Sequence, residues 1–449
     1  MRLLDPSAFG LIGMITVFTG FLERIKDSGL GTSLIYHTSL TRTDKDTVFW
    51  FNIFSGLLLT GILFISSKLL ADYYNEPILN ELIKTFSITF IISALSITHK
   101  TLLIKKLDFK KIFQVEVVGL TLSAVLAIIS AYLGFGVWSL IVLHLSRALM
   151  LSVTFWILSD YTPNIKFSFK ILKKHFEYSF PVLGTQSLNY WTRNADNFFI
   201  GSLLGSEALG FYSRAYFFVT MPVQKISGII GSVLFPSLSI LKDNKNKAAD
   251  LFLKSMKMTA FITFPLLGGV IVLTEPFVFN LFGIKWMPII STLKILSVLA
   301  LLQSVMTFTG SIFYSQGATR LNFKISVVYG IFNILIFYIG SLFSIEMVAL
   351  LLLCGFILYV YPRLYFVSKL IDIGVIDILI NLKHIFFVNS ICMLISFIFF
   401  NLTFDDSRNL FSLVSGILIY LFLYIISNYM FNKKNSLEFV NNIRNVVKS

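Results

Sequence analysis

The chain has 449 residues, of which 56% are hydrophobic and only 13% are charged. A soluble protein carries roughly 25% charged residues, so this composition excludes an ordinary water-soluble fold. The net charge of +14 does not indicate a nucleic-acid partner, because lysine and arginine are spread over many short segments and form no continuous basic patch. Cys354 and Cys392 both lie in apolar runs, which argues against a disulfide framework or a thiolate metal site.

Mostly apolar runs of about 20 residues recur along the whole chain, and each is long enough to cross a hydrocarbon layer about 30 Å thick. We therefore predict an all-α integral membrane protein with no soluble domain between its spans. The thirteen predicted transmembrane helices cover residues 7–27, 47–70, 79–98, 112–133, 137–158, 178–203, 208–235, 253–274, 288–315, 322–343, 346–368, 378–402 and 409–430.

The connections between these spans alternate in charge. One set is rich in lysine and arginine, and the other is short and mostly acidic or neutral, with Lys285 and Arg408 as its only basic residues. By the positive-inside rule the basic set is cytoplasmic. It consists of residues 42–45, 100–111, 166–174, 242–247, 320–324 and 369 and the tail 433–448. The C-terminus is then predicted to be cytoplasmic and Met1 to be outside, with no signal peptide to carry it there.

An internal repeat also suggests that a helix is expected in front of Met1. Five residues recur at an offset of 200: Leu3, Leu4, Ala8, Gly10 and Phe18 match Leu203, Leu204, Ala208, Gly210 and Phe218. A shorter echo relates Leu107–Lys110 to Leu321–Lys324. Two parallel halves of six helices would explain both echoes. The sixth span then lacks a partner, so we expect the first helix of the N-terminal half to precede Met1.

This pairing predicts two pseudo-symmetric lobes followed by a helix pair. Residues 1–170 form the N-terminal lobe without its first helix, and residues 171–370 form the six-helix C-terminal lobe. Residues 371–449 form the terminal helix pair and a cytoplasmic tail.

Catalytic motifs are missing from the sequence, which contains no Walker loop, no His-Glu-x-x-His and no Gly-x-Ser-x-Gly. His37, His99, His175 and His384 fall near predicted cytoplasmic span ends, where an interfacial role is the simplest interpretation. The predicted outward loops are too short to hold the acid and base groups of a membrane-bound polymerase or ligase. We therefore predict no enzymatic activity, no cofactor and no bound metal.

The sixth predicted span carries polar residues that a membrane interior should exclude. Gln186, Asn189, Arg193 and Asp196 recur at steps of three to four residues, so they share one helix face. A charge at bilayer depth costs about 2.5 to 3.5 kcal/mol, and such residues usually face a bundle interior or an aqueous cavity. We interpret this face as the wall of a transport pathway. The alternative is an ion pair between Arg193 and Asp196 that only locks the helix.

Further intramembrane charges occur on neighbouring predicted spans. Arg214 and Lys225 are eleven residues apart and share a face, although both could snorkel to an interface. His144 and Arg147 lie three residues apart in the fifth span, where Arg147 could instead satisfy helix-end carbonyls. Glu116 lies within the fourth span.

Taken together, the candidate lumen residues carry a positive net charge. Four of them are cationic and only Asp196 is anionic, so an anionic cargo is predicted. The four cations are Arg147, Arg193, Arg214 and Lys225. Asp196 and Glu116 are the candidates for binding a coupling proton or sodium ion.

Several short motifs resemble those of the Wzx-type polysaccharide flippases, which belong to the multidrug/oligosaccharidyl-lipid/polysaccharide exporter superfamily. The resemblance covers nearly the whole chain and is carried by Arg2–Gly10, Arg193–Asn197, Ile200–Gly201, Leu204–Gly205, Leu209–Tyr212, Phe235–Leu238 and Phe282–Trp286. It implies a fourteen-helix fold of two six-helix lobes and a terminal pair, with both ends cytoplasmic. This chain departs from the family pattern because the opening motif normally follows a first helix.

The resemblance also implies a function. Such proteins move undecaprenyl-diphosphate-linked sugar repeat units across the inner membrane for O-antigen, capsule or exopolysaccharide synthesis, and their partners include the polysaccharide polymerase and chain-length machinery. A diphosphate crossing the bilayer needs neutralising cations in a wet cavity. Two alternatives are a multidrug efflux antiporter, which should favour acidic lumen residues, and a membrane-bound polymerase or ligase, which should need a large outward loop.

Overall fold

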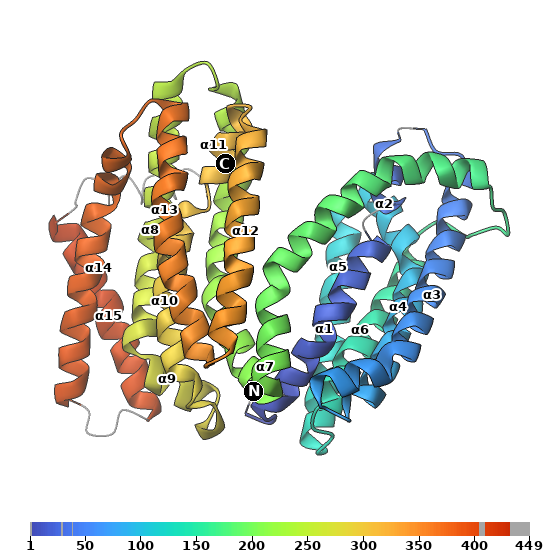
Figure 1. The fold of residues 1–449 in the computed structure, drawn as a ribbon, viewed down its shortest axis with the longest axis horizontal. Helices are drawn as coiled ribbons and strands as arrows, with labels where there is room; N and C mark the ends of the chain where they lie inside the picture. The colour runs from blue at the N-terminus through green and yellow to red at the C-terminus, as the bar shows by residue number, and fades with distance from the viewer. Residues whose placement is uncertain (1, 28–29, 38, 404–408, 432–449) are drawn as a thin grey trace. The chain divides into compact units, whose positions relative to one another are not determined.

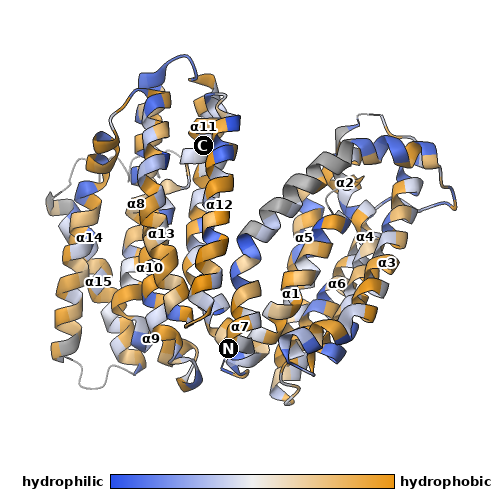
Figure 2. Ribbon diagram, viewed as in Figure 1, coloured by the Kyte–Doolittle hydropathy of each residue, from blue (hydrophilic) through white to orange (hydrophobic). Residues whose placement is uncertain are grey.

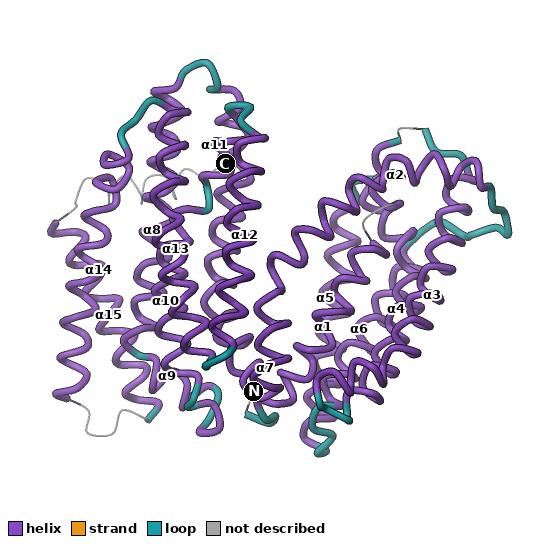
Figure 3. The backbone as a smooth tube through the Cα atoms, in the orientation of Figure 1, coloured by secondary structure: helices purple, strands orange, loops and turns teal. Residues whose placement is uncertain are grey.

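A computed structural model describes residues 2–27, 30–37, 39–403 and 409–431 of the chain. In these residues all regular structure is helical, and short loops join the helices (Figure 3). Twelve of the described helices are long and apolar enough to cross a membrane. Hydrophobic residues cover most of the surface of helices such as α12, α13 and α14, and hydrophilic residues gather at ends and connections such as that between residues 240 and 245 (Figure 2). The prediction of an all-α integral membrane protein is confirmed.

The chain divides into two compact units. We call residues 3–210 the N-terminal unit (Figure 1). Its helices are α1 (Pro6–Asp27), α2 (Leu30–Tyr36), α3 (Arg42–Tyr74), α4 (Leu79–Lys105), α5 (Phe109–Tyr132), α6 (Trp138–Leu158) and the first part of α7 (Phe169–Ile240). Within this unit α4 packs against both α3 and α6, and α5 packs against α6.

Residues 1–2 and 211–449 form the second unit, which we call the C-terminal unit. It contains the rest of α7, then α8 (Lys245–Val272), α9 (Thr274–Leu281), the 3-10 helix η1 (Ile284–Trp286), α10 (Ile289–Met306), α11 (Thr309–Ser315), α12 (Thr319–Ser341), α13 (Ile345–Ile371), α14 (Val375–Thr403) and α15 (Leu410–Phe431). Helix α8 packs against α10 and α14, and α13 packs against α10 and α12. The boundary falls between residues 210 and 211, whereas the predicted lobes divide at 170, so those lobes stay a prediction.

Local sequence signals set where several helices begin. Thr41 and Asp44 form a capping box at the start of α3, in which each side chain accepts a hydrogen bond from the other residue's backbone N–H. Asp108 caps α5, Asn244 caps α8 and Ser344 caps α13 in the simpler way, through one side-chain oxygen. These caps place the charged and polar connections at the ends of the apolar rods.

Two predicted spans, 178–203 and 208–235, belong to the single long element α7. It is interrupted at Gly205, whose φ of 87° and ψ of −179° suit glycine and hardly any other residue. The connection expected between these two spans is therefore reduced to one non-helical residue, Gly205. Within the described residues α7 counts as one of the twelve membrane-length helices, whereas two of the thirteen predicted spans fall in it, and this accounts for the difference of one.

Helices α1 and α7 cross at a pair of glycines. Gly10 lies directly against the carbonyl of Ser206, and Gly210 lies against the carbonyl of Pro6, so a Cβ on either glycine would overlap an oxygen. The contact is reciprocal, because Pro6 and Ser206 are also 200 residues apart. Helix α1 begins at Pro6, and α7 resumes at Ser206 after the break at Gly205. Equivalent residues of the predicted repeat therefore occupy equivalent positions and touch one another.

The second echo does not hold in the same way. Asp108 is the N-cap that precedes α5, whereas Asn322 is the fourth residue of α12. Leu107 has a positive φ of 57° just before its cap, and the residue with that role before α12 is Gly317, with φ 72°. The echoed letters are thus displaced by about one helical turn, so chance similarity explains them better than the repeat.

The glycine crossing leads to a test of stability. Gly210→Ala should lower the thermal midpoint and the membrane abundance, because the backbones of α1 and α7 must move apart. Gly228→Ala on the same helix is the matched control, since a Cβ there meets no atom within 4 Å. In the control, higher helix propensity should keep or raise stability by up to about 1 kcal/mol. Equal thermal midpoints for the two variants would contradict the close crossing.

Candidate functional site

Glu116 is the centre of a three-residue charge cluster within the N-terminal unit. Its Oε1 lies 2.8 Å from the Nζ of Lys100, and its Oε2 lies 3.2 Å from an Nη of Arg147. Helices α4, α5 and α6 each supply one of these residues. Each side chain keeps between 31% and 46% of its surface exposed, so the group is accessible and carries one excess positive charge. Arg147, predicted to line the pathway, is therefore also an ion-pair partner.

Sequence reasoning missed this cluster, although one signal was present. Lys100 lies five residues before the end of α4, and Glu116 lies seven residues after the start of α5. Adjacent antiparallel helices place such residues at similar depth. His144, one turn before Arg147, instead packs its ring against Phe86, with the centroids 5.1 Å apart.

The polar face of α7 is described only in part. Gln186 and Asn189 lie outside the residues whose side chains are described. Arg193 is exposed and Asp196 is buried, with its Oδ1 accepting a hydrogen bond from the N–H of Asn197 at 2.8 Å. The two predicted roles of Arg193, as a pathway residue and as the ion-pair partner of Asp196, both stay predictions.

The remaining predicted cations belong to the C-terminal unit. Arg214 is half-buried, and its guanidinium lies 5.8 Å from the ring centroid of Phe217. Lys225, three turns further along α7, is exposed. The lumen role predicted for Arg214 and Lys225 stays a prediction.

One intramembrane cation escaped sequence reasoning entirely. Arg363 of α13 donates hydrogen bonds to Thr309 Oγ1 at 2.6 Å, to Asn322 Oδ1 at 3.3 Å and to the hydroxyl of Tyr359. Its guanidinium also lies 5.3 Å from the ring centroid of Phe313. All these partners are neutral, so they stabilise the charge of Arg363 through dipoles rather than through a carboxylate. An arginine inside the predicted span 346–368 was the available signal.

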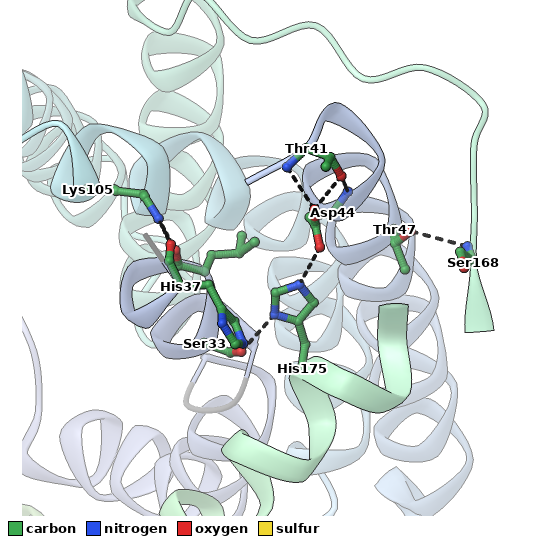
Figure 4. A network of polar contacts seen from close by, with 9 residues as sticks. Ser33, His37, Thr41, Asp44, Thr47, Lys105, Ser168 and His175 are labelled. Carbon is green, nitrogen blue, oxygen red and sulfur yellow. Dashed lines mark hydrogen bonds and ion pairs between the residues drawn. The ribbon is translucent and has the colours of Figure 1, made fainter. Parts of the chain in front are cut away.

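A buried network fixes the start of α7 to α2 and α3 (Figure 4). The Nδ1 of His175 lies 2.7 Å from Ser33 Oγ, and its Nε2 lies 3.2 Å from Asp44 Oδ1. The backbone N–H of Ser168 also donates to Thr47 Oγ1 at 3.2 Å. These contacts fit a neutral imidazole that carries its proton on Nε2, donates to Asp44 and accepts from Ser33.

This Ser-His-Asp arrangement is not an open catalytic site, because both Ser33 and His175 are completely buried. A serine nucleophile must reach its substrate, so we interpret the network as a structural link that holds the start of α7 to α2 and α3. We call it the His175 network. It also corrects the interfacial role predicted for His175, and His99 is likewise buried. Burial lowers the pKa of His175, while the hydrogen bond and charge of Asp44 partly oppose that shift.

Glu116 should matter more for stability than either of its partners. Glu116→Gln leaves both Lys100 and Arg147 without a carboxylate, whereas Arg147→Gln leaves Glu116 paired with Lys100. Because all three side chains are partly exposed, we expect Glu116→Gln to lower the unfolding free energy by up to about 1 kcal/mol, and Arg147→Gln to lower it less. Thermal unfolding of both proteins in one detergent measures this difference, and an equal or larger loss in Arg147→Gln would reject the central role of Glu116.

The His175 network should make the thermal stability of the N-terminal unit fall at acidic pH. The folded-state pKa of His175 is depressed, so its contribution to stability is full above the unfolded-state pKa of about 6.5 and is lost as the pH falls below it. The thermal midpoint should therefore fall between about pH 7 and pH 5. His175→Gln should flatten this decline, and His384→Gln at an exposed position serves as the control. A decline of the same size in His175→Gln would mean that other groups cause it.

Comparison with known proteins places the fold in a family. Residues 1–291 match the family model described as "Polysaccharide biosynthesis protein". The teichuronic acid biosynthesis protein TuaB of Bacillus subtilis (strain 168) is 28% identical over 336 residues, which cover 74% of this chain and 70% of TuaB. The lipopolysaccharide biosynthesis protein WzxC of Escherichia coli (strain K12) is 27% identical over 328 residues, which cover 73% of this chain and 67% of WzxC.

A solved structure shares the fold of the chain. The lipid II flippase MurJ, in its inward closed conformation, matches 96% of this chain and 93% of its own with a TM-score of 0.76. At 18% sequence identity this likeness concerns the fold alone. The family match, in contrast, extends over well more than half of the sequence and confirms the resemblance carried by the motifs. The chain belongs to the polysaccharide biosynthesis protein family.

Proposed function

We propose that the protein is a flippase that moves undecaprenyl-diphosphate-linked oligosaccharide repeat units across the bacterial inner membrane for surface polysaccharide synthesis. The observation that carries this proposal is the excess of arginine in the membrane-spanning helices. Arg147, Arg193, Arg214 and Arg363 lie within spans, while the carboxylate of Glu116 is already shared between two cations. A diphosphate needs such cations to leave water, and bidentate guanidinium groups suit phosphate oxygens.

The family and the relatives support the same class of cargo. TuaB and WzxC are named for the biosynthesis of teichuronic acid and lipopolysaccharide, and MurJ is named as a lipid II flippase. Two of these names refer to polysaccharide synthesis and one to the flipping of a lipid, and a lipid-linked sugar is the cargo that would suit both. A multidrug antiporter of the same superfamily would favour acidic lumen residues for cationic drugs, which the excess of arginine argues against.

The mechanism follows from the two units and the charges that they carry. Alternating access would expose a lumen lined by Arg147, Arg193 and Arg214 first to the cytoplasm and then to the outside. Asp196 and Glu116 are the two candidates for the coupling-ion role, and Glu116 would have to exchange a proton or sodium ion while paired with Lys100 and Arg147. The basic connections and the C-terminus would face the cytoplasm. The protein would act without enzymatic chemistry and would pass its cargo to the polymerase and chain-length machinery.

The proposal is tested by complementation of a strain that lacks the protein. The deletion should make lipid-linked repeat units accumulate on the inner leaflet, and the wild-type chain should restore their outward movement. Arg193→Gln should restore it about tenfold less well at normal membrane abundance, because the charge-assisted contact to phosphate is lost. The exposed Lys173→Gln on the same helix is the matched control. The outer-leaflet appearance of lipid-linked sugar and the protein level are measured together.

Two outcomes would contradict the proposal. An unchanged distribution of lipid-linked sugar in the deletion strain would reject flipping. Normal export by Arg193→Gln, or full rescue of a defect by the double change Arg193→Gln and Asp196→Asn, would remove the cargo contact assigned to Arg193 while leaving flipping intact.

A further inference from the structure

A basic pocket lies within the N-terminal unit where α3 begins and α4 ends. It encloses about 610 Å³. Four cationic side chains line it, those of Arg42, Lys45, Lys105 and Lys106, together with the single carboxylate of Asp160. All its lining residues belong to α3, to α4 and to the connections before α3, after α4 and after α6, so the pocket is complete within one unit.

The charges of this pocket are only partly compensated by the protein. The Nζ of Lys106 lies 2.9 Å from Asp160 Oδ2, but both side chains are more than half exposed, so water weakens this pair. Arg42 donates to Thr162 O at 3.3 Å, and Lys105 donates to Leu34 O at 2.7 Å and to His37 O (Figure 4).

The two neighbouring carboxylates of α3, Asp44 and Asp46, do not line the pocket. Asp44 is buried in the capping box and the His175 network. Asp46 accepts hydrogen bonds from Tyr161 Oη at 2.7 Å and from the N–H of Asn164 at 3.2 Å. In the described part of the chain Lys45 has no ion-pair partner. The pocket therefore holds a clear excess of positive charge.

The position of the pocket along the helices identifies its surroundings. Arg42 and Lys105 are the terminal residues of helices α3 and α4, which are long and apolar enough to cross a membrane, so a bilayer around these helices would have its headgroup region near the pocket. Two helices that adjoin the pocket carry tryptophans, Trp50 on α3 and Trp156 on α6, and tryptophan is enriched at membrane interfaces. Trp50 donates from Nε1 to Asn164 O at 2.8 Å, and Trp156 donates to Leu95 O at 2.9 Å.

We propose that this pocket binds the phosphate headgroup of an anionic phospholipid of the surrounding membrane. Basic pockets between transmembrane helices at the cytoplasmic side suit such headgroups, and each nearby lysine or arginine adds to the attraction. The volume accommodates a phosphate with its glycerol moiety. A transported cargo must be released to the opposite leaflet, whereas every lining residue here sits at one end of one unit. The site is therefore assigned to a resident lipid, independently of the cargo proposed above.

A bound lipid would strengthen contacts already present. Arg42 holds the connection between α6 and α7 through Thr162, and Lys105 holds the C-terminal carbonyls of α2. A phosphate between these cations would neutralise their mutual repulsion. Because a ligand that binds only the folded state stabilises it, the lipid should raise the thermal midpoint.

The test variant removes charge without removing these backbone contacts. Lys45→Gln together with Lys106→Gln spares Arg42 and Lys105. The matched control is Lys110→Gln together with Lys173→Gln, which removes the same charge from exposed positions outside the pocket. The four changed lysines all belong to the basic connections or to the ends of the helices beside them.

Native mass spectrometry of the purified full chain measures the binding. Dioleoylphosphatidylglycerol is titrated against dioleoylphosphatidylcholine, which has the same acyl chains and no net charge. We expect one phosphatidylglycerol to bind in preference, with its affinity reduced about tenfold in the pocket variant and unchanged in the control. The thermal midpoint should rise with phosphatidylglycerol in the wild type and the control only.

Other outcomes would overturn the proposal. Equal binding of the two lipids, or equal affinity in the pocket variant and the control, would show that the pocket is not an anionic-lipid site. Farnesyl diphosphate and inorganic phosphate are added as competitors. Displacement of the lipid by farnesyl diphosphate at lower concentration would assign the pocket to the diphosphate of the cargo, and displacement by inorganic phosphate alone would assign it to a free anion.

Discussion

The close crossing of α1 and α7 is the constraint on which the N-terminal unit depends. Gly10 and Gly210 let each helix lie against a backbone carbonyl of the other, which no larger residue permits. The crossing follows directly after two helix starts, Pro6 and the residue after Gly205. Small residues at helix crossings are the usual means of close packing in membranes, where lipid offers no hydrophobic drive for association. Here a glycine allows the close approach twice, Gly10 in the first copy of the repeat and Gly210 in the second.

Much of the fold could be predicted because hydropathy reports membrane-length helices directly. The offset of 200 even located residues that touch, and the predicted spans 178–203 and 208–235 lie on either side of the break in α7 at Gly205. The seven-residue α2 was not predicted, since it is too short to give a span signal. The echo at Asn322 misled because four matching letters carry little information about register.

The candidate site was harder to predict, because its contacts join distant segments. Glu116 was recognised as an intramembrane charge, but nothing in its own sequence names Lys100 and Arg147 as partners. Arg363 was missed for a different reason: hydropathy is averaged over about 19 residues, so one arginine in an apolar run barely changes the value. Its neutral partners, Thr309 and Asn322, come from other helices and are visible only in three dimensions.

The crossing of α1 and α7 also constrains how the protein is made. Gly10 meets Ser206, so α1 enters the membrane long before its partner has been synthesised. At about 5 to 20 residues per second, the interval is roughly 10 to 40 seconds. During that time the face of α1 that carries Gly10 can be covered only by lipid, by other early helices or by insertion factors. The N-terminal unit therefore cannot complete its packing until residue 210 has been translated, and α1 must remain stable in the membrane without α7 until then.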